Sequence, residues 1–167
     1  SQLTVFELIA LGRQPYTNWV DKLSENDLKK INKAIQLTEV GHLKESRFYE
    51  LSDGQLQRVL IARALAQDTD VIILDEPTAH LDMHHTFKIF QLLKNLVDST
   101  QKTIIISTHQ INLAIEIVDE LIIMNSNEVI NGDKNELIAQ NKLENLFPEE
   151  ILTFNKKLQQ FTISKNN

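Results

Sequence analysis

Two acidic side chains, Asp75 and Glu76, directly follow the apolar run Val71 to Leu74. Such a run predicts a buried strand, whose end would place both carboxylates at the carboxyl edge of a sheet, where open α/β folds bind ligands. We assign a magnesium ion, held directly or through water, to Asp75, and the orientation or deprotonation of a water that attacks a γ-phosphate to Glu76. Because neighbouring strand residues point to opposite faces, we expect the two side chains to diverge. The simpler alternative is a strand that ends in an acidic turn before Pro77.

A second group, Ser52-Asp53-Gly54-Gln55, precedes an apolar helical stretch. Ser52 is the residue type of an N-cap, and Gln55 stands where a capping box places its partner. In the simpler interpretation these residues only begin a helix. In the functional interpretation the unpaired amides and the positive dipole end of that helix suit a phosphate, and Gly54 lets the backbone come close. The two interpretations are compatible.

Histidines occur at two further places. His109 follows a second apolar run, residues 103–106, so we expect it beside Glu76 on the same sheet edge, where it could contact a γ-phosphate. A lone histidine is more often structural, and the position relative to Glu76 is what favours the functional interpretation. The second place is a cluster with no accompanying carboxylate-rich motif, so we expect no dedicated metal site there; its members are His80, His84 and His85.

The elements that position these residues change in type near residue 68. Before it, Thr4 with Glu7 forms one capping-box pattern and Ser24 opens another helix, so residues 1–50 are predicted to be all-helical. After it, apolar runs alternate with helical periodicity, which predicts an α/β fold whose parallel sheet is covered on both faces. The segments are strand 71–74, helix 83–98, strand 103–106, helix 111–118, a hairpin over 121–130 and a helix capped at Asp133. Pro15 and residues 16–19 predict a turn or loop between the first two helices. One face of helix 83–98 is expected to pack on the sheet, and it carries Met83, Phe87, Phe90, Leu93 and Val97.

Composition limits the classes of protein. The chain has 167 residues, enough for one globular core, and no cysteine, which excludes disulfides and thiolate metal sites. Its net charge of -6 argues against binding to nucleic acid. Membrane-length apolar runs are absent, which predicts a soluble, cytosolic chain. Because the first residue is Ser1 and no signal peptide follows, we expect that an upstream segment has been removed.

One motif of nucleotide-binding proteins is absent from the sequence. A P-loop requires Gly-x-x-x-x-Gly-Lys-Ser/Thr, and the chain's glycines are followed by Arg, His, Gln and Asp. Half of an ATP site is therefore missing. The four glycines are Gly12, Gly41, Gly54 and Gly132.

Four ordered motifs resemble those of ATP-binding cassette (ABC) transporter ATPases over residues 1 to about 140. They are Leu51 to Gln55, similar to the Leu-Ser-Gly-Gly-Gln signature; Val71 to Glu76, similar to Walker B with the catalytic glutamate; Ala79 to Asp82, similar to the D-loop; and Thr108-His109, similar to the switch histidine. Residues 4–8 and 12–16 resemble the subfamily importing siderophores, haem or cobalamin. The sequence departs from the family at Asp53, where glycine is usual, and Gln2 lies too near the first helix to be assigned as the Q-loop glutamine.

The resemblance implies a partial P-loop NTPase (RecA-like) core with a helical ABC subdomain. Its expected domains are residues 1–66 (helical, signature), 67–147 (C-terminal half of the core) and 148–167 (extension). It further implies that ATP and Mg²⁺ act in the intact protein, with catalytic Glu76 and His109, metal ligand Asp75, and nucleotide contacts from Ser52, Gly54, Gln55 and Asp82.

The implied assembly is a head-to-tail homodimer, bound to transmembrane permease subunits at the inner face of the cell membrane. In it, the signature of one subunit covers ATP held by the P-loop of the other. Without that P-loop we expect the chain alone to neither bind ATP tightly nor turn it over. Two alternatives stay open: a non-catalytic module that docks a partner or donates its signature in trans, and a soluble ABC ATPase without a transport role.

Overall fold

The computed structural model describes residues 3–17, 22–124, 128–144, 146–147 and 151–164 of the chain. The chain divides into two compact units, Ser1–Ser107 and Thr108–Asn167. Among the described residues, no helix combines the length and apolar character needed to cross a membrane. Each unit has a hydrophobic core of its own.

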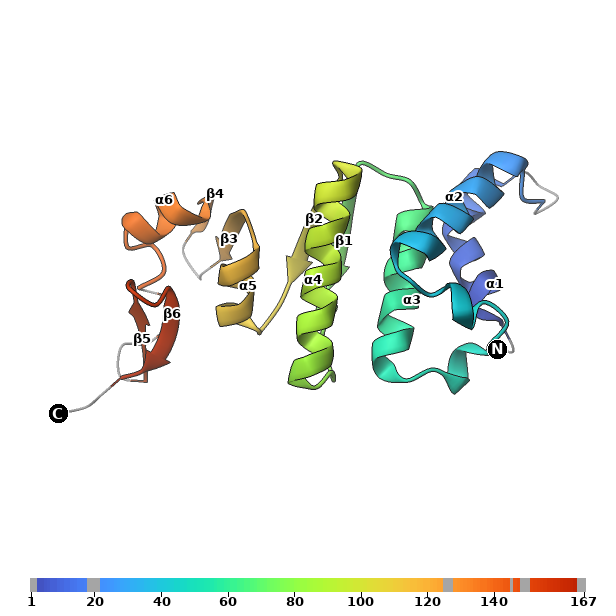
Figure 1. The fold of residues 1–167 in the computed structure, drawn as a ribbon. Helices are drawn as coiled ribbons and strands as arrows, with labels where there is room; N and C mark the ends of the chain where they lie inside the picture. The colour runs from blue at the N-terminus through green and yellow to red at the C-terminus, as the bar shows by residue number, and fades with distance from the viewer. Residues whose placement is uncertain (1–2, 18–21, 125–127, 145, 148–150, 165–167) are drawn as a thin grey trace. The chain divides into compact units, whose positions relative to one another are not determined.

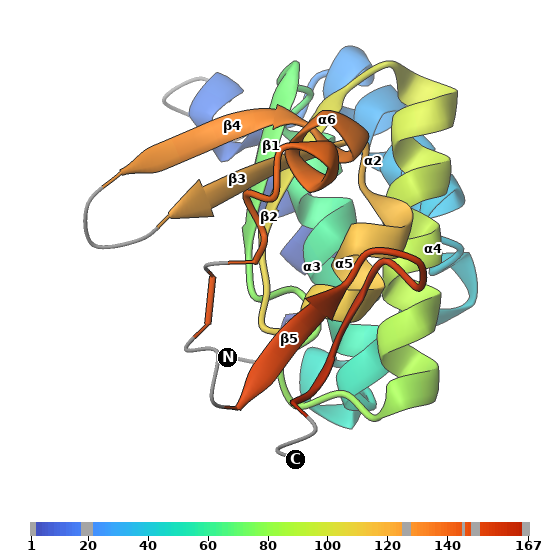
Figure 2. The ribbon, with the colours of Figure 1, turned by 90° about the vertical axis from the view of Figure 1, so that its left-hand side faces the viewer.

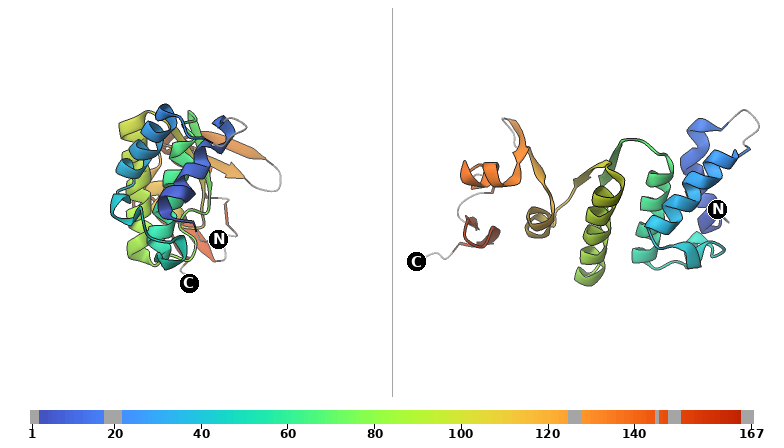
Figure 3. Two further views of the ribbon diagram at one scale, coloured as in Figure 1. Left: turned by 90° about the vertical axis from the view of Figure 1, so that its right-hand side faces the viewer. Right: turned by 45° about the horizontal axis from the view of Figure 1, so that its top comes forward.

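The first unit begins with helices, as predicted for residues 1–50. Helices α1 and α2 both contact α3, and Figure 3 shows these blue helices beside the green α3. The non-helical exception is an isolated bridge between Thr4 and Arg47. In order, the helices are α1 (Val5–Ala10), the 3₁₀ helix η1 (Leu11–Tyr16), α2 (Glu25–Leu37), η2 (Gly41–Leu43), η3 (Phe48–Glu50) and α3 (Asp53–Ala66).

Capping residues determine where α1 and α2 begin. Thr4 forms a reciprocal capping box with Glu7, which confirms the predicted start of α1. Ser24 forms another with Asp27 at the start of α2. The predicted loop at Pro15 is instead part of η1, because proline's fixed φ is compatible with a helical turn. The rest of that predicted loop, around Trp19, lies outside the described residues.

After α3 the chain forms a parallel strand pair with a helical crossover (Figure 1). Strand β1 (Val71–Asp75) pairs with β2 (Thr103–Ser107), and α4 (Met83–Thr100) connects them. The register pairs Ile73 with Ile105 and Asp75 with Ser107. The predicted parallel sheet is therefore confirmed.

The two faces of this strand pair differ. Ile72, Leu74, Ile104 and Ile106 pack on the core of the first unit. The opposite face is exposed, and Ile73 has 74% of its surface accessible. The expectation of a sheet covered on both faces is thus wrong for this unit.

Helix α4 buries a face that is rotated from the predicted one. Its buried residues include Ile89, Phe90 and Leu93. Phe90 and Leu93 were expected there, but Met83 is 87% exposed and Phe87 is 50% exposed. The 3.6-residue period was assigned correctly, but its phase at the start of the helix was not, because periodicity does not reveal which neighbour the first turn meets.

The second unit contains helices and hairpins. Strands β3 (Glu120–Met124) and β4 (Val129–Asp133) are antiparallel, which confirms the predicted hairpin and is visible in Figure 2. Helix α5 (Ile111–Ile117) precedes them, and α6 (Lys134–Ala139) follows with Asp133 as its cap, as predicted. A further antiparallel pair, β5 (Leu152–Asn155) and β6 (Gln160–Ile163), was not predicted. Asn112 of α5 holds this pair through two hydrogen bonds with the backbone of Phe161.

A buried charged side chain joins the first helices to the end of α3. The Arg13 guanidinium, 3% exposed, pairs with Asp27 at 2.8 Å and donates to the carbonyl oxygens of Ala66 and Gln67 at the end of α3. Arg13 thus satisfies α3 carbonyls that have no partner within the helix.

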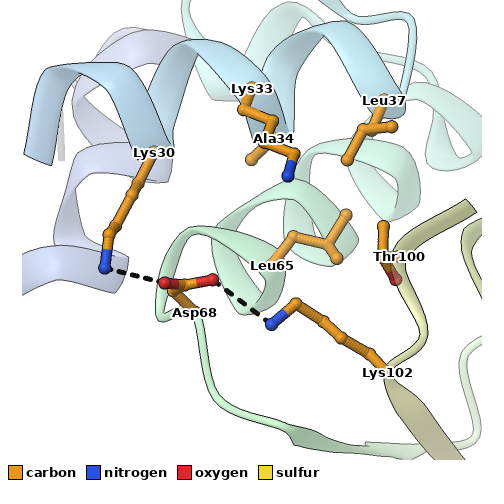
Figure 4. A pocket seen from close by; sticks show the side chains of 8 residues that line it. All are labelled: Lys30, Lys33, Ala34, Leu37, Leu65, Asp68, Thr100 and Lys102. Carbon is orange, nitrogen blue, oxygen red and sulfur yellow. Dashed lines mark hydrogen bonds and ion pairs between the residues drawn. The ribbon is translucent and has the colours of Figure 1, made fainter. Parts of the chain in front are cut away.

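A second charged link involves Asp68, which lies between two lysines (Figure 4). Its carboxylate is 2.7 Å from Lys30 of α2 and 3.2 Å from Lys102, next to β2. Hydrogen bonding from Lys30 is the main cause that lowers the pKa of Asp68.

The Arg13–Asp27 pair predicts a pH-dependent stability difference. Hydrogen bonds from Ser24, with further help from Arg13, lower the pKa of Asp27 from 3.8 to about 2. A depressed pKa contributes stability that is complete above the unfolded value and is lost as the pH falls through the folded one. Asp27→Asn should therefore lower the Tm by several degrees at neutral pH, and the gap should close near pH 2, as measured by thermal melts across pH. Asp70→Asn changes an exposed carboxylate and is the control; equal gaps for both variants would contradict the prediction.

Candidate functional site

The two acidic residues lie where β1 ends, as predicted, and a serine of the neighbouring strand connects them. Ser107 Oγ donates a hydrogen bond to Asp75 Oδ1 at 2.5 Å. The same oxygen accepts a hydrogen bond from the Glu76 backbone amide at 3.0 Å. This arrangement follows from the strand register, which sets Ser107 opposite Asp75. One hydroxyl thus fixes the carboxylate of one acid and the backbone of the other.

Glu76 itself lies outside the strand. Strand β1 ends at Asp75, and Glu76 has a φ of 47°, in the left-handed region. A turn follows, in which the Ala79 amide donates to the Glu76 carbonyl oxygen at 3.0 Å. The expectation that both residues lie in the strand is therefore wrong, and strand alternation, which requires extended backbone at both residues, does not apply to this pair. The left-handed turn sets the direction of Glu76 instead.

His109 follows β2 by two residues and belongs to the second unit, whereas Asp75 and Glu76 belong to the first. Its side chain is exposed. The predicted proximity of His109 to Glu76 stays a prediction.

Ser52 and Gln55 form the predicted cap of α3. Gln55 Oε1 accepts from the Ser52 amide at 3.0 Å, and the Gln55 amide donates to Ser52 Oγ at 3.4 Å. Asp53, the first residue of the helix, is exposed. The Ser52 and Gln55 side chains thus stabilise the helix start, as the simpler interpretation requires.

Gly54 has a close neighbour that sequence reasoning missed. A Cβ atom placed on Gly54 would lie 2.8 Å from Cδ2 of His85, in the first turn of α4. The absence of a side chain at this position is therefore needed for the contact between α3 and α4. The sequence marks His85 only as a member of the histidine cluster and does not indicate its contact with Gly54.

Asp82 is the N-cap of α4. Its carboxylate accepts from the His85 amide at 2.8 Å and lies 2.8 Å from the His85 ring nitrogen Nδ1. The hydrogen bond from the His85 amide is the main cause that lowers the pKa of Asp82. Within the described ranges, no three His, Asp or Glu side chains gather as a possible metal site.

A cavity of about 340 Å³ lies beside these residues. Its walls include Ser52, Gly54 and Gln55 of α3 and His85 and Lys88 of α4. The cavity therefore opens next to the amide groups at the start of α3, where the helix dipole favours an anion.

The end of β1 suits a magnesium ion by the chemistry of its donors. Mg²⁺ prefers oxygen ligands and is usually held by one or two carboxylates together with substrate phosphates. Asp75 presents an exposed carboxylate, and Ser107 adds a hydroxyl oxygen beside it. Sequence reasoning missed Ser107, although pairing the last residues of two adjacent parallel strands would have indicated it.

The chain is similar to known proteins along most of its length. The family described as ABC transporter matches residues 1–79. The petrobactin import ATP-binding protein FpuD of Bacillus anthracis is 38% identical over 141 residues, which are 84% of this chain and 52% of FpuD. The chain spans about half the length of the curated relatives it matches.

Solved structures give the same assignment. An ABC transporter in an inward-facing conformation is 30% identical with a TM-score of 0.79, over 88% of this chain and 59% of that one. A dimeric ATP-binding cassette in a post-hydrolysis state with ADP and Pi is 32% identical with a TM-score of 0.61, over 79% and 57%. These matches confirm the predicted α/β fold class, that of a P-loop ATPase core with a parallel sheet. By sequence and by structure, the chain is similar to ABC transporter ATPases over most of its own length.

Proposed function

We propose that this chain forms the signature and Walker B part of an ATP-hydrolysing ABC importer subunit. The observation that carries the proposal is the arrangement at the end of β1, where Ser107 links the Asp75 carboxylate to the Glu76 backbone. Such a rigid link suits a site whose groups must be in place before the reaction begins.

Each of the acidic residues has a distinct proposed role. Asp75 holds the magnesium ion, directly or through water, and the ion when bound neutralises charge on the phosphates. Glu76 orients the attacking water and accepts its proton, which is the task of a general base. His109 contacts the γ-phosphate. Catalysis by positioned groups of this kind is typical of phosphoryl transfer.

The start of α3 is the proposed nucleotide-facing surface. Ser52, Gly54 and Gln55 contact ATP through the helix N-terminus, and Asp82 contributes from the loop before α4. The support is the cavity beside Ser52, Gly54 and Gln55 together with the favourable dipole of a 14-residue helix. Asp53 is exposed at the same end of the helix.

The proposed assembly is a homodimer with membrane-embedded permease subunits, placing the protein at the cytoplasmic face of the membrane. A dimeric relative with ADP and Pi supports the dimer. The import of an iron-siderophore, haem or cobalamin is supported by the named petrobactin importer among the relatives.

The proposed domains are residues 1–66 (helical), 67–147 (half of the core) and 148–167 (extension). The sequence itself contains no Gly-x-x-x-x-Gly-Lys-Ser/Thr, so the P-loop must come from outside it. We propose that this chain is one piece of a longer ATPase. The same observation favours a second candidate, a non-catalytic module that donates its signature to the P-loop of a partner.

Glu76→Gln tests the catalytic proposal. In the protein supplied with its P-loop, the variant should lose at least roughly a hundredfold in kcat, since general-base catalysis contributes that much or more. ATP affinity should persist, because phosphate contacts come mostly from a P-loop. Measured ATPase rates and nucleotide-binding titrations provide the check.

The matched control is Glu45→Gln, which neutralises an exposed carboxylate of the helical part and should leave kcat unchanged. Wild-type turnover in Glu76→Gln would remove Glu76 from its role. Absence of ATPase activity in the wild-type protein with its P-loop would favour the non-catalytic module.

Ser107→Ala tests the link at the end of β1. Removing the hydroxyl leaves the Asp75 carboxylate and the Glu76 amide without their shared partner, and a hydrogen bond to a charged group is worth about 1.5–3 kcal/mol. We expect roughly a tenfold or greater loss of kcat and a higher Mg²⁺ requirement. Ser107→Thr keeps the hydroxyl and should retain most activity. Equal activity of Ser107→Ala and the wild-type protein in a magnesium titration would contradict the link.

A further inference from the structure

Helices α3 and α4 lie side by side in the first unit (Figure 1), and their N-terminal ends meet at Gly54 and His85. The built Cβ of Gly54 lies 2.8 Å from Cδ2, 3.4 Å from Cγ and 3.6 Å from Nε2 of the imidazole. Three ring atoms therefore lie around the point where any other residue would place its first side-chain atom. At 2.8 Å, a Cβ would force the ring or the helix to shift.

The same imidazole is held from its other side. Its Nδ1 lies 2.9 Å and 2.8 Å from the two carboxylate oxygens of Asp82, the N-cap of α4. Asp82 also accepts from the His85 backbone amide, so the residue is attached to Asp82 at two points. The ring is consequently not a loose surface side chain, although 46% of it is exposed.

The cavity and the core next to the Gly54–His85 contact show how this contact bears on the distance between α3 and α4. The cavity of about 340 Å³ lies next to the contact and is lined by both helices, with Gln55 from α3 and Lys88 from α4 among its lining residues. Further along the two helices, Val59 of α3 and Ile89 of α4 belong to the same buried core, and Ile89 also lines the cavity. The imidazole thus contacts the first turn of α3 from the first turn of α4, while Val59 and Ile89 pack in the core.

We propose that His85 is a positioning residue that sets the distance between residues 52–55 and the D-loop, residues 79–82. This proposal rests on the proposed ATPase function, in which both segments face nucleotide. His85 packs on Gly54 and hydrogen-bonds to Asp82, so a shift of either segment is transmitted to the other. It also gives Gly54 a second reason to lack a side chain, besides the close approach of phosphate.

A double-mutant cycle on thermal stability tests the contact. Gly54→Ala should lower the Tm by roughly 3–10 °C, the range expected for overpacking in a packed contact. In the His85→Ala background the same change should cost little, since the space is then free. Gly41→Ala is the matched control, because its Cβ would meet nothing nearer than Ile35 Cγ2 at 3.8 Å. Equal losses from Gly54→Ala in both backgrounds would overturn the proposal.

Kinetics with the P-loop present test the role in positioning. His85→Ala and His85→Phe should each lower kcat roughly tenfold, since displaced groups lose catalytic geometry, while the KM for ATP changes less than about twofold. His85→Phe fills the space but cannot hydrogen-bond to Asp82. His85→Asn can donate to Asp82 and should restore part of the rate.

The two measurements separate the proposals from each other. If the Tm loss from Gly54→Ala depends on His85 but the wild-type protein has no ATPase activity, the contact is supported and the ATPase function is not. If the Tm loss depends on His85 but kcat is unchanged in all three His85 variants, the positioning role is overturned while the ATPase function stays intact.

Discussion

The buried guanidinium of Arg13 is the interaction on which the arrangement of the first unit depends. It pairs with Asp27 of α2 and donates to the carbonyl oxygens of Ala66 and Gln67 at the end of α3. An unpaired charge in this place would be strongly unfavourable, so η1, α2 and α3 must meet here together. Gly12 precedes Arg13 and allows the approach, since a Cβ there would lie 2.3 Å from the Arg63 carbonyl oxygen.

The position of α3 in turn determines where the reactive groups stand. Strand β1 begins a few residues after α3 ends, and Asp68 in the intervening turn is held by Lys30 and Lys102. The start of β1 is therefore tied to both the helical part and the neighbouring strand, and Ser107 ties its carboxyl end to β2. Groups placed on rigid elements in this way keep their geometry better than groups on free loops, which is what the proposed roles of Asp75 and Glu76 require.

Local rules were sufficient for much of this fold. The capping boxes at Thr4 and Ser24 and the apolar run from Val71 were visible because each depends on neighbours in the sequence. The unpredicted hairpin β5–β6 consists of two four-residue strands that alternate apolar and polar residues, a signal too short to separate from a loop.

Contacts between distant elements were beyond these rules. Ser107 joins Asp75 only through strand register, and His85 reaches Gly54 only because α3 and α4 lie side by side. Neither relation is encoded in local periodicity. The candidate acids could therefore be named from the sequence, but the residues that hold them in place required the structure.

At Glu76, the residue type that best fits the left-handed backbone differs from the residue type that carries a carboxylate. Glycine and asparagine adopt a φ of 47° at lower cost than glutamate, so either would relieve strain at the end of β1. Both would also remove the carboxylate. In the proposed role of Glu76 as general base, selection for turnover would keep the glutamate, whereas selection for a more stable fold alone would favour a residue that adopts this φ at lower cost.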